Sequence, residues 1–257
     1  MIRSQAGGIK APVVFLVIVI VCVAGLVAVK LLGGPARGHG DNQAGADNQQ
    51  AVTFTEDFTG ETLASLQAQG WSVWYKPAMP EVRDNLQTTF NPETLSVENG
   101  MLAATQGAGG FMYSANWGDY TLTFKFKVGF SLSGYTYWCG LAFRNDSTWE
   151  NGTAGQAASG SWPRNSYILQ LGYGGSTNNL WKIVNGVWAS TPIASKEMDV
   201  TTNDWYNVTL VASGSSLKVY LDNQSLFDVT DSSLTSGGIG LLNCSGPFYF
   251  DDVVASA

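Results

Sequence analysis

Apolar side chains recur at every second position between Trp205 and Val254, and this constrains the fold more than any other feature of the chain. A period of two is typical of a β-strand with one buried face, and short turns divide the stretch into five strands that predict a meander. One sheet of such strands cannot cover its own apolar face, so a second sheet has to pack against it. The stretch therefore predicts a β-sandwich. The alternating residues of its first hairpin are Tyr206, Val208, Leu210, Ala212, Leu217, Val219 and Leu221.

The composition agrees with an all-β fold. The 257 residues are enough for one large β core, and the 30 glycines suit many turns. Charged residues make up only 13% of the chain, about half the usual share, and the net charge is -7. Because phosphate backbones would be repelled, we expect no nucleic-acid partner.

An apolar segment precedes the alternating region. Residues 11–29 are nineteen uncharged residues between Lys10 and Lys30, long enough for a helix that crosses a bilayer. We expect a membrane anchor at 11–32 after a short tail at 1–10, with the N-terminus inside and the lipid bilayer as a partner. A cleaved signal peptide is the alternative, although no small-residue cleavage site follows closely. Residues 33–51 have no apolar period and predict a flexible linker.

The distribution of titratable residues argues against common catalytic sites. The only histidine, His39, lies in the linker, so residues 52–257 cannot build a Ser-His-Asp group or a histidine metal site. Glycosidases that use paired carboxylates need acidic residues close together, and the glutamates here are scattered. These observations favour a binding module over an enzyme.

Within residues 52–257, Asn99-Gly100 predicts a tight hairpin and 119–128 predicts a strand with one dry face. Alternation in the next strands places four polar or aromatic residues on one outer face, where Gly140 and Ala142 would leave room for a ligand. A long loop with two tryptophans begins at the end of the same strand, and such loops are often functional. The resulting candidate binding residues are Trp138, Arg144, Gln170 and Lys182 on the face, with Trp149, Trp162 and Tyr173 at its rim.

The order of these segments resembles a known superfamily. The opening strand with Glu56-Asp57-Phe58, the hairpin at 95–102, the strand Gly140–Arg144, the run at 238–241 and the final strand at 250–253 are similar to the concanavalin A-like lectin/glucanase jelly roll. Laminin G-like modules and the 3-keto-disaccharide hydrolase domain are the most similar members. The resemblance implies an all-β, two-sheet antiparallel jelly-roll sandwich over 52–257 that binds a glycan or oligosaccharide. With the anchor, this predicts a lectin-like domain outside the cell, on a single-pass membrane protein.

The resemblance also implies a possible structural calcium ion, because several members carry one. A hard cation needs several carboxylates together, and the first and last strands of a closed sandwich often pair. The candidate ligands are Glu56 or Asp57 with Asp251 or Asp252. These acids could equally face solvent at a sheet edge.

Cys139 and Cys244 are the only cysteines of the domain, and an oxidising location predicts a disulfide between them. Two buried free thiols are the alternative.

Two other functions stay open. One is a glycoside-processing enzyme of the same fold, and the other is a pilin-like filament subunit, for which the usual prepilin cleavage signal is missing.

Overall fold

The structure is a computed structural model, and it describes residues 53–75, 95–105, 108–129, 137–147, 149–151, 161–173, 177–244 and 247–257. The chain divides into residues 1–48 and residues 49–257. The expected anchor at 11–32 and linker at 33–51 lie outside the described residues. Within the described part of the chain, no helix has both the length and the apolar character needed to span a membrane.

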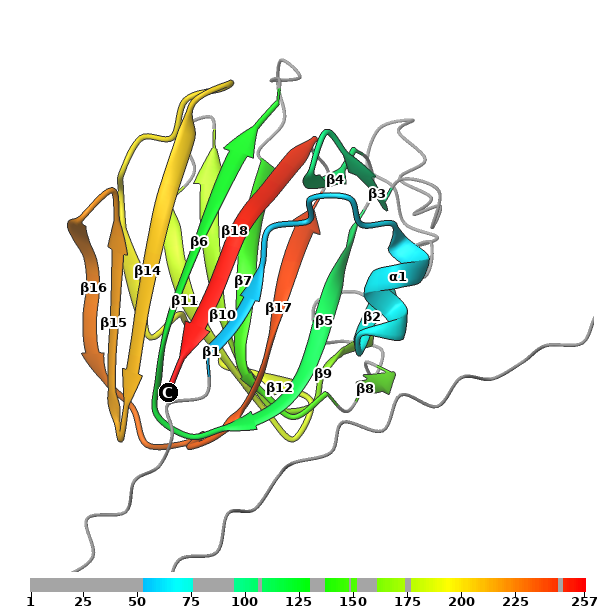
Figure 1. Ribbon diagram of the computed structural model, residues 1–257. Helices are drawn as coiled ribbons and strands as arrows, with labels where there is room; N and C mark the ends of the chain where they lie inside the picture. The colour runs from blue at the N-terminus through cyan, green and yellow to red at the C-terminus, as the bar shows by residue number, and fades with distance from the viewer. Residues whose placement is uncertain are drawn as a thin grey trace, which may run out of the picture. The chain divides into compact units, whose positions relative to one another are not determined.

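Two antiparallel sheets form the described domain, and Figure 1 looks onto the first of them. The strands of the first sheet are β1 (Thr53–Glu56), β3 (Leu95–Glu98), β4 (Met101–Ala104), β6 (Tyr120–Val128), β14 (Trp205–Ser213), β15 (Ser216–Leu221), β16 (Gln224–Thr230) and β18 (Phe248–Ser256). They run in the order β16-β15-β14-β6-β18-β4-β3. β1 also pairs with β18, so the first and last strands are neighbours, as the sequence predicts.

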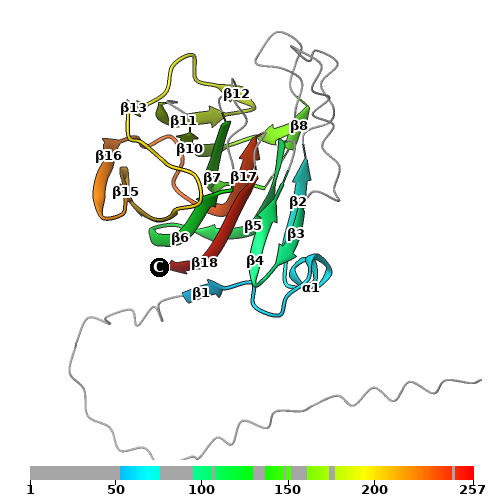
Figure 2. The same cartoon turned by 90° about the horizontal axis from the view of Figure 1, so that it is seen from above.

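The second sheet lies behind the first, and Figure 2 shows both from above. Its strands are β2 (Trp71–Tyr75), β5 (Ala108–Trp117), β7 (Tyr137–Asn145), β10 (Ser166–Tyr173), β11 (Asn178–Val184), β12 (Val187–Trp188), β13 (Ala194–Lys196) and β17 (Gly237–Cys244). They run in the order β12-β11-β10-β7-β17-β5-β2, and β13 also pairs with β11. A separate hairpin joins β8 (Trp149–Asn151) and β9 (Ser161–Pro163). The helix α1 (Leu63–Ala68) lies at the edge of the sandwich beside β2 and β3.

The core fills the space between the sheets because the strands alternate as the sequence predicts. Every second residue of β6, from Tyr120 to Val128, is buried, and the residues between them are half-buried. β14 and β15 follow the same pattern. The two-sheet antiparallel sandwich predicted from the alternation is therefore confirmed.

The predicted turns are also confirmed, while the predicted meander is wrong. Asn99-Gly100 and Asn185-Gly186 both have positive φ at each residue, which is the conformation of a tight type I′ hairpin. Four of the five C-terminal strands belong to the first sheet, but β17 crosses to the second sheet and pairs with β5 and β7. Ile239, Leu241 and Leu242 are all fully or almost fully buried, so β17 is covered on both faces and suits the middle of a sheet.

The predicted disulfide is wrong, because Cys139 is a free, fully buried cysteine. β7 and β17 are neighbours, but their register places Cys139 opposite Asn243 and Trp138 opposite Cys244. Residues directly opposite share a face, whereas residues one position apart lie on opposite faces of a sheet. The two cysteines are therefore one residue out of register for a bond.

Candidate functional site

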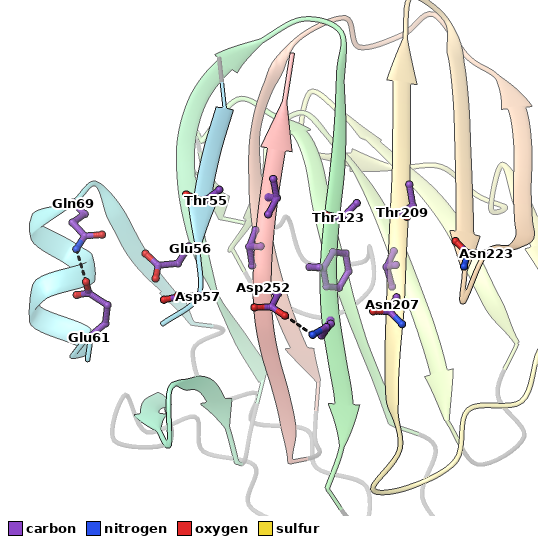
Figure 3. Close-up of a pocket in the computed structure, with 15 residues that line it drawn as sticks. Thr55, Glu56, Asp57, Glu61, Gln69, Thr123, Asn207, Thr209, Asn223 and Asp252 are labelled. Carbon is purple, nitrogen blue, oxygen red and sulfur yellow. Dashed lines mark hydrogen bonds and ion pairs between the residues drawn. The ribbon is translucent and has the colours of Figure 1, made fainter. Parts of the chain in front are cut away.

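A polar cleft lies on the outer face of the first sheet, where β1, β6, β14 and β18 run side by side (Figure 3). It has a volume of about 1000 Å³. Helix α1 and the segment before it form one wall, and the turn after β15 lies at the opposite side. The polar side chains of this polar cleft are Thr55, Glu56, Asp57, Glu61, Gln69, Thr123, Lys125, Asn207, Thr209, Asn223 and Asp252.

The floor of the polar cleft consists of two rows of side chains that cross the strands. Thr209 of β14 is directly opposite Thr123 of β6, and Val254 of β18 continues that row. Two residues further along β6, Lys125 is directly opposite Asn207. Rows two residues apart are separated by roughly 6.6 Å along a strand, and neighbouring strands by about 4.8 Å. Hydroxyl, amide and ammonium groups are therefore presented at regular intervals.

A bulge in β18 brings acidic groups to this floor. The register of β18 against β6 shifts between Asp251 and Val254, and Asp252 has a left-handed backbone with φ 49°. As a result, the Asp252 carboxylate forms an ion pair with Lys125. The hydrogen bond from the Lys125 ammonium to Asp252 raises the pKa of the lysine above its ordinary value.

The carboxyl groups around the cleft have different environments. Burial raises the pKa of Glu56, against the hydrogen bond that the Phe58 N–H donates to its Oε1 at 2.7 Å. Burial also raises the pKa of Asp251. Glu61 accepts hydrogen bonds from Ser65 and Gln69, and these lower its pKa.

This arrangement suits a neutral, hydroxyl-rich ligand. Four carboxylates and one ammonium line the cleft, so an anion would be repelled. Carboxylates accept hydrogen bonds from hydroxyl groups, and amide and threonine groups can both donate and accept. A sugar presents many such hydroxyl groups.

The predicted calcium ligands are partly brought together, and a calcium ion at them stays a prediction. Glu56, Asp57 and Asp252 all line the polar cleft. Their oxygens are already bonded within the protein: Glu56 to the Phe58 N–H, Asp57 to the Thr59 N–H at 3.0 Å, and Asp252 to Lys125. Asp251 likewise accepts a hydrogen bond from the N–H of Asp252 at 2.8 Å. Across the described residues, no group of three or more acidic, histidine or cysteine side chains could hold a metal ion.

The predicted binding face on the second sheet is not assembled as expected. Gln170 does lie on the outer face of β10, where its Oε1 accepts hydrogen bonds from Trp181 Nε1 at 2.8 Å and Asn179 Nδ2 at 3.3 Å. Lys182 lies on the other face, directly opposite the core residue Tyr167, and its ammonium pairs with Asp231 at 2.6 Å. Lys182 and Gln170 therefore do not share a face.

Arg144 is also absent from that outer face. Gly238 is opposite Asn145 and Ile239 is opposite Phe143, so Arg144 is the extra residue of a β-bulge, with φ 46°. The bulge turns its side chain to the end of the sandwich, where the guanidinium is fully buried. It donates hydrogen bonds to the carbonyl oxygens of Gly214 at 2.7 Å and Leu234 at 2.8 Å. Arg144 thus connects the second sheet to two turns of the chain.

The expected space beside Gly140 and Ala142 is filled. A Cβ on Gly140 would lie 2.1 Å from the carbonyl oxygen of Leu169, so this glycine permits a close approach of two strands. Ala142 is fully buried in a second apolar cluster with Met112, Ile168, Ile183 and Leu242, on the outer face of the second sheet. The side chains of Trp138, Trp149, Trp162 and Tyr173 lie outside what the structure describes, so their binding role stays a prediction.

The sequence gives little indication that the residues of the polar cleft form a site. Thr123, Lys125, Asn207 and Thr209 are the polar partners in the alternating strands, and alternation predicts only that they face solvent. The pairing of β6 with β14, and of β1 with β18, brings them into one surface. No period or motif in the sequence specifies these long-range pairs.

Solved structures with a similar fold include proteins named for carbohydrate binding or hydrolysis. The carbohydrate-binding module CBM66 from Bacillus subtilis has a TM-score of 0.52 at 18% identity, over 73% of this chain and 96% of that chain. LamAcat from Zobellia galactanivorans has a TM-score of 0.55 at 14% identity, over 79% and 96%. SCLam, a non-specific endo-β-1,3(4)-glucanase of family GH16, has a TM-score of 0.57 at 11% identity, over 84% and 94%. At these identities the likeness establishes the shared jelly-roll fold.

A search of curated protein sequences gave no match. A family model does match, and it covers residues 53–255, which is nearly the whole of the described domain. The chain therefore belongs to the family of the 3-keto-alpha-glucoside-1,2-lyase-like domain, a carbohydrate-related member of the concanavalin A-like jelly rolls.

Proposed function

We propose that the domain binds a glycan in the polar cleft, outside the cell, and that the anchor at residues 11–32 holds it at the membrane. The observation that supports the binding site is the regular floor of hydroxyl, amide and charged groups from adjacent strands. The family's name refers to a glucoside, and CBM66 is named as a carbohydrate-binding module, so the ligand class agrees with the relatives.

The direct test removes hydroxyl groups from the floor without changing its shape. Thr123→Val with Thr209→Val deletes two adjacent hydroxyls, and each lost hydrogen bond costs about 0.5–1.5 kcal/mol of binding. We expect the double variant to bind oligosaccharides roughly tenfold more weakly in calorimetric titration. Thr121→Val is the matched control, because Thr121 lies on the same face of β6 but does not line the cleft.

The oligosaccharide panel should contain neutral glucans, xylans and galactans. If no member binds at millimolar concentration, the proposed function is wrong. If a member binds but the double variant and the control bind it equally well, the glycan site is elsewhere on the domain.

The membrane location is supported by the uncharged segment alone. Cells that produce the full chain should retain it in the membrane fraction after carbonate washing, and protease added outside intact cells should digest the β-domain. A variant that lacks residues 11–29 should lose membrane retention. Protection of the domain from external protease would contradict the proposed orientation.

A lyase is the second candidate, because the family description names one. A 1,2-elimination removes the C2 proton of a 3-keto-glucoside, breaks the C1–O bond, forms a C1=C2 double bond and returns a proton to the leaving oxygen. Carboxyl groups with raised pKa, such as Glu56 in the polar cleft, suit this proton transfer. Mass spectrometry after incubation with a 3-keto-disaccharide tests the reaction. Loss of the elimination product in Glu56→Gln would assign the base, whereas no product from the unaltered chain would exclude this lyase activity.

A further inference from the structure

An aromatic residue, a lysine and a second aromatic residue form a row across the first sheet, next to the polar cleft. Trp205 of β14 is directly opposite Lys127 of β6, and Lys127 is directly opposite Tyr249 of β18. The Lys127 ammonium lies 4.9 Å from the centre of the Trp205 ring and 4.9 Å from that of Tyr249. These three residues are called the aromatic row below.

The aromatic row is held in place before any ligand binds. A Cβ on Gly129 would lie 2.9 Å from Cε2 of Tyr249, so the ring rests closely against the Gly129 backbone, with Pro247 beside it. The ammonium between two π faces is itself an attractive arrangement. Trp205 is nevertheless 36% exposed, and only Trp205 and Val187 are large apolar side chains exposed to this degree among the described residues.

The lysine of the row has no carboxylate partner in the described part of the chain. The ion pairs found there join Lys125 to Asp252, Arg144 to Asp119, Lys182 to Asp231, and Lys218 to Asp228. Lys127 therefore differs from Lys125, which lies two residues away on the same face and is neutralised by Asp252. Lys127 supplies an uncompensated positive charge beside an exposed ring.

The aromatic row continues the floor of the polar cleft. Lys127 and Trp205 are each two residues from Lys125 and Asn207, so the two rows are about 6.6 Å apart along the strands. That distance is close to the length of one sugar unit in an extended chain. A glycan that occupies the cleft would thus place its next unit on the aromatic row.

We propose that the aromatic row is a subsite for a carboxylated sugar, a uronate, at the end of the glycan that the polar cleft binds. The uronate ring stacks on Trp205, and its carboxylate pairs with Lys127. The carboxylate in the adjacent row of the cleft, Asp252, is neutralised by Lys125, and exposed charges more than about 8 Å away are screened at physiological ionic strength. This inference rests on the proposed function and names the class of ligand.

The test compares acidic oligosaccharides with their own carboxyl-reduced forms, in which each uronate has become the neutral sugar. Fragments of glucuronoxylan, pectin and alginate serve as probes, titrated into the full chain by calorimetry. We expect at least one acidic probe to bind roughly tenfold more tightly than its reduced form. This preference should shrink as the salt concentration rises.

Variants locate the preference on the sheet. Lys127→Gln should abolish the difference between the acidic and reduced probes, and Lys127→Arg should retain it. Trp205→Ala should weaken both forms through lost stacking, and the indole N–H signal of Trp205 in NMR spectra should shift when the probe binds. Lys218→Gln is the matched control, because Lys218 also lies on the first sheet but is paired with Asp228, and it should change nothing.

The outcomes separate this inference from the proposed function. If neutral and acidic forms bind equally and Lys127→Gln has no effect, the uronate subsite is wrong while glycan binding stands. If no acidic or neutral probe binds at millimolar concentration, both proposals are wrong. Binding that shifts no Trp205 signal would also overturn the subsite.

Discussion

Replacing Arg144 with methionine should destabilise the domain strongly, because the buried guanidinium satisfies two carbonyl groups at once. Its hydrogen bonds to Gly214 and Leu234 are 2.7 and 2.8 Å long, and its side chain is fully buried. Hydrogen bonds to a charged group contribute about 1.5–3 kcal/mol each, so losing the two in Arg144→Met should lower the free energy of unfolding by about 3–6 kcal/mol. For a domain of this size that corresponds to a Tm lower by roughly 6–24 °C.

Urea unfolding of the full chain, followed by tryptophan fluorescence, measures this change. Methionine keeps an unbranched apolar side chain on the bulged backbone, so the change removes the hydrogen bonds together with the weaker ion pair to Asp119. Lys218→Met is the control, because an exposed ion pair such as that of Lys218 contributes about 0–1 kcal/mol. A loss below about 1 kcal/mol for Arg144→Met would refute the role of Arg144 as a connector between the sheets.

Three further predictions concern pH, the buried thiol and one glycine. Burial alone would raise the pKa of Asp231, but hydrogen bonds from Lys182 and neighbouring groups outweigh burial and hold the pKa well below its ordinary value. The stability that this carboxylate contributes should therefore be complete above about pH 5 and be lost on acidification, so Asp231→Asn should flatten the acid limb of a curve of Tm against pH. Burial raises the pKa of the Cys139 thiol, so iodoacetamide should modify it only after unfolding, without reductant; a disulfide-linked peptide that contains Cys139 would contradict this. Gly237→Ala should lower the free energy of unfolding in urea by about 2–5 kcal/mol, because its Cβ would lie 2.5 Å from backbone atoms at φ 144°. Gly214→Ala, with φ 54° and open space around the Cβ, should lower it by only about 1–2 kcal/mol, and equal losses would show that crowding is not the cause.

Strands with one buried face and one solvent-exposed face could be predicted well from the sequence. β6, β14 and β15 alternate cleanly, and the tight turns that contain glycine or asparagine lie where those residues are needed. In such strands the polar residues mark the outer face, so the period of two fixes both the strand and its orientation.

Strands covered on both faces could not be oriented in this way. In β10, the neighbours Tyr167, Ile168 and Leu169 are all fully buried, so apolarity no longer distinguishes the two faces. For the same reason Lys182 of β11 was predicted on the outer face, whereas Trp181 and Ile183 lie there and Lys182 faces inward. β5 was not predicted at all, because its glycine, alanine and serine residues have low strand propensity.

The candidate site depends on contacts that the sequence does not specify. The bulges at Arg144 and Asp252 each reverse the direction of a charged side chain, and neither position is a glycine that would indicate a positive φ. Arg144 was therefore expected in a binding face and instead lies buried. Asp252 was expected near β1, which the pairing confirms, but its ion pair with Lys125 follows only from the neighbouring β6.

The position of β18 has a consequence for the biosynthesis of the domain. β18 is the common neighbour of β6, β4 and β1 within the first sheet, and it comprises residues 248–256. Until the ribosome has released these residues, β1 and the β3–β4 hairpin have no strand that joins them to β6. Such long-range pairing is slow and leaves apolar surface exposed meanwhile. Folding of the first sheet must therefore wait until residues 248–256 have emerged from the ribosome, and a nascent chain that stalls before residue 248 remains a substrate for chaperones and proteases.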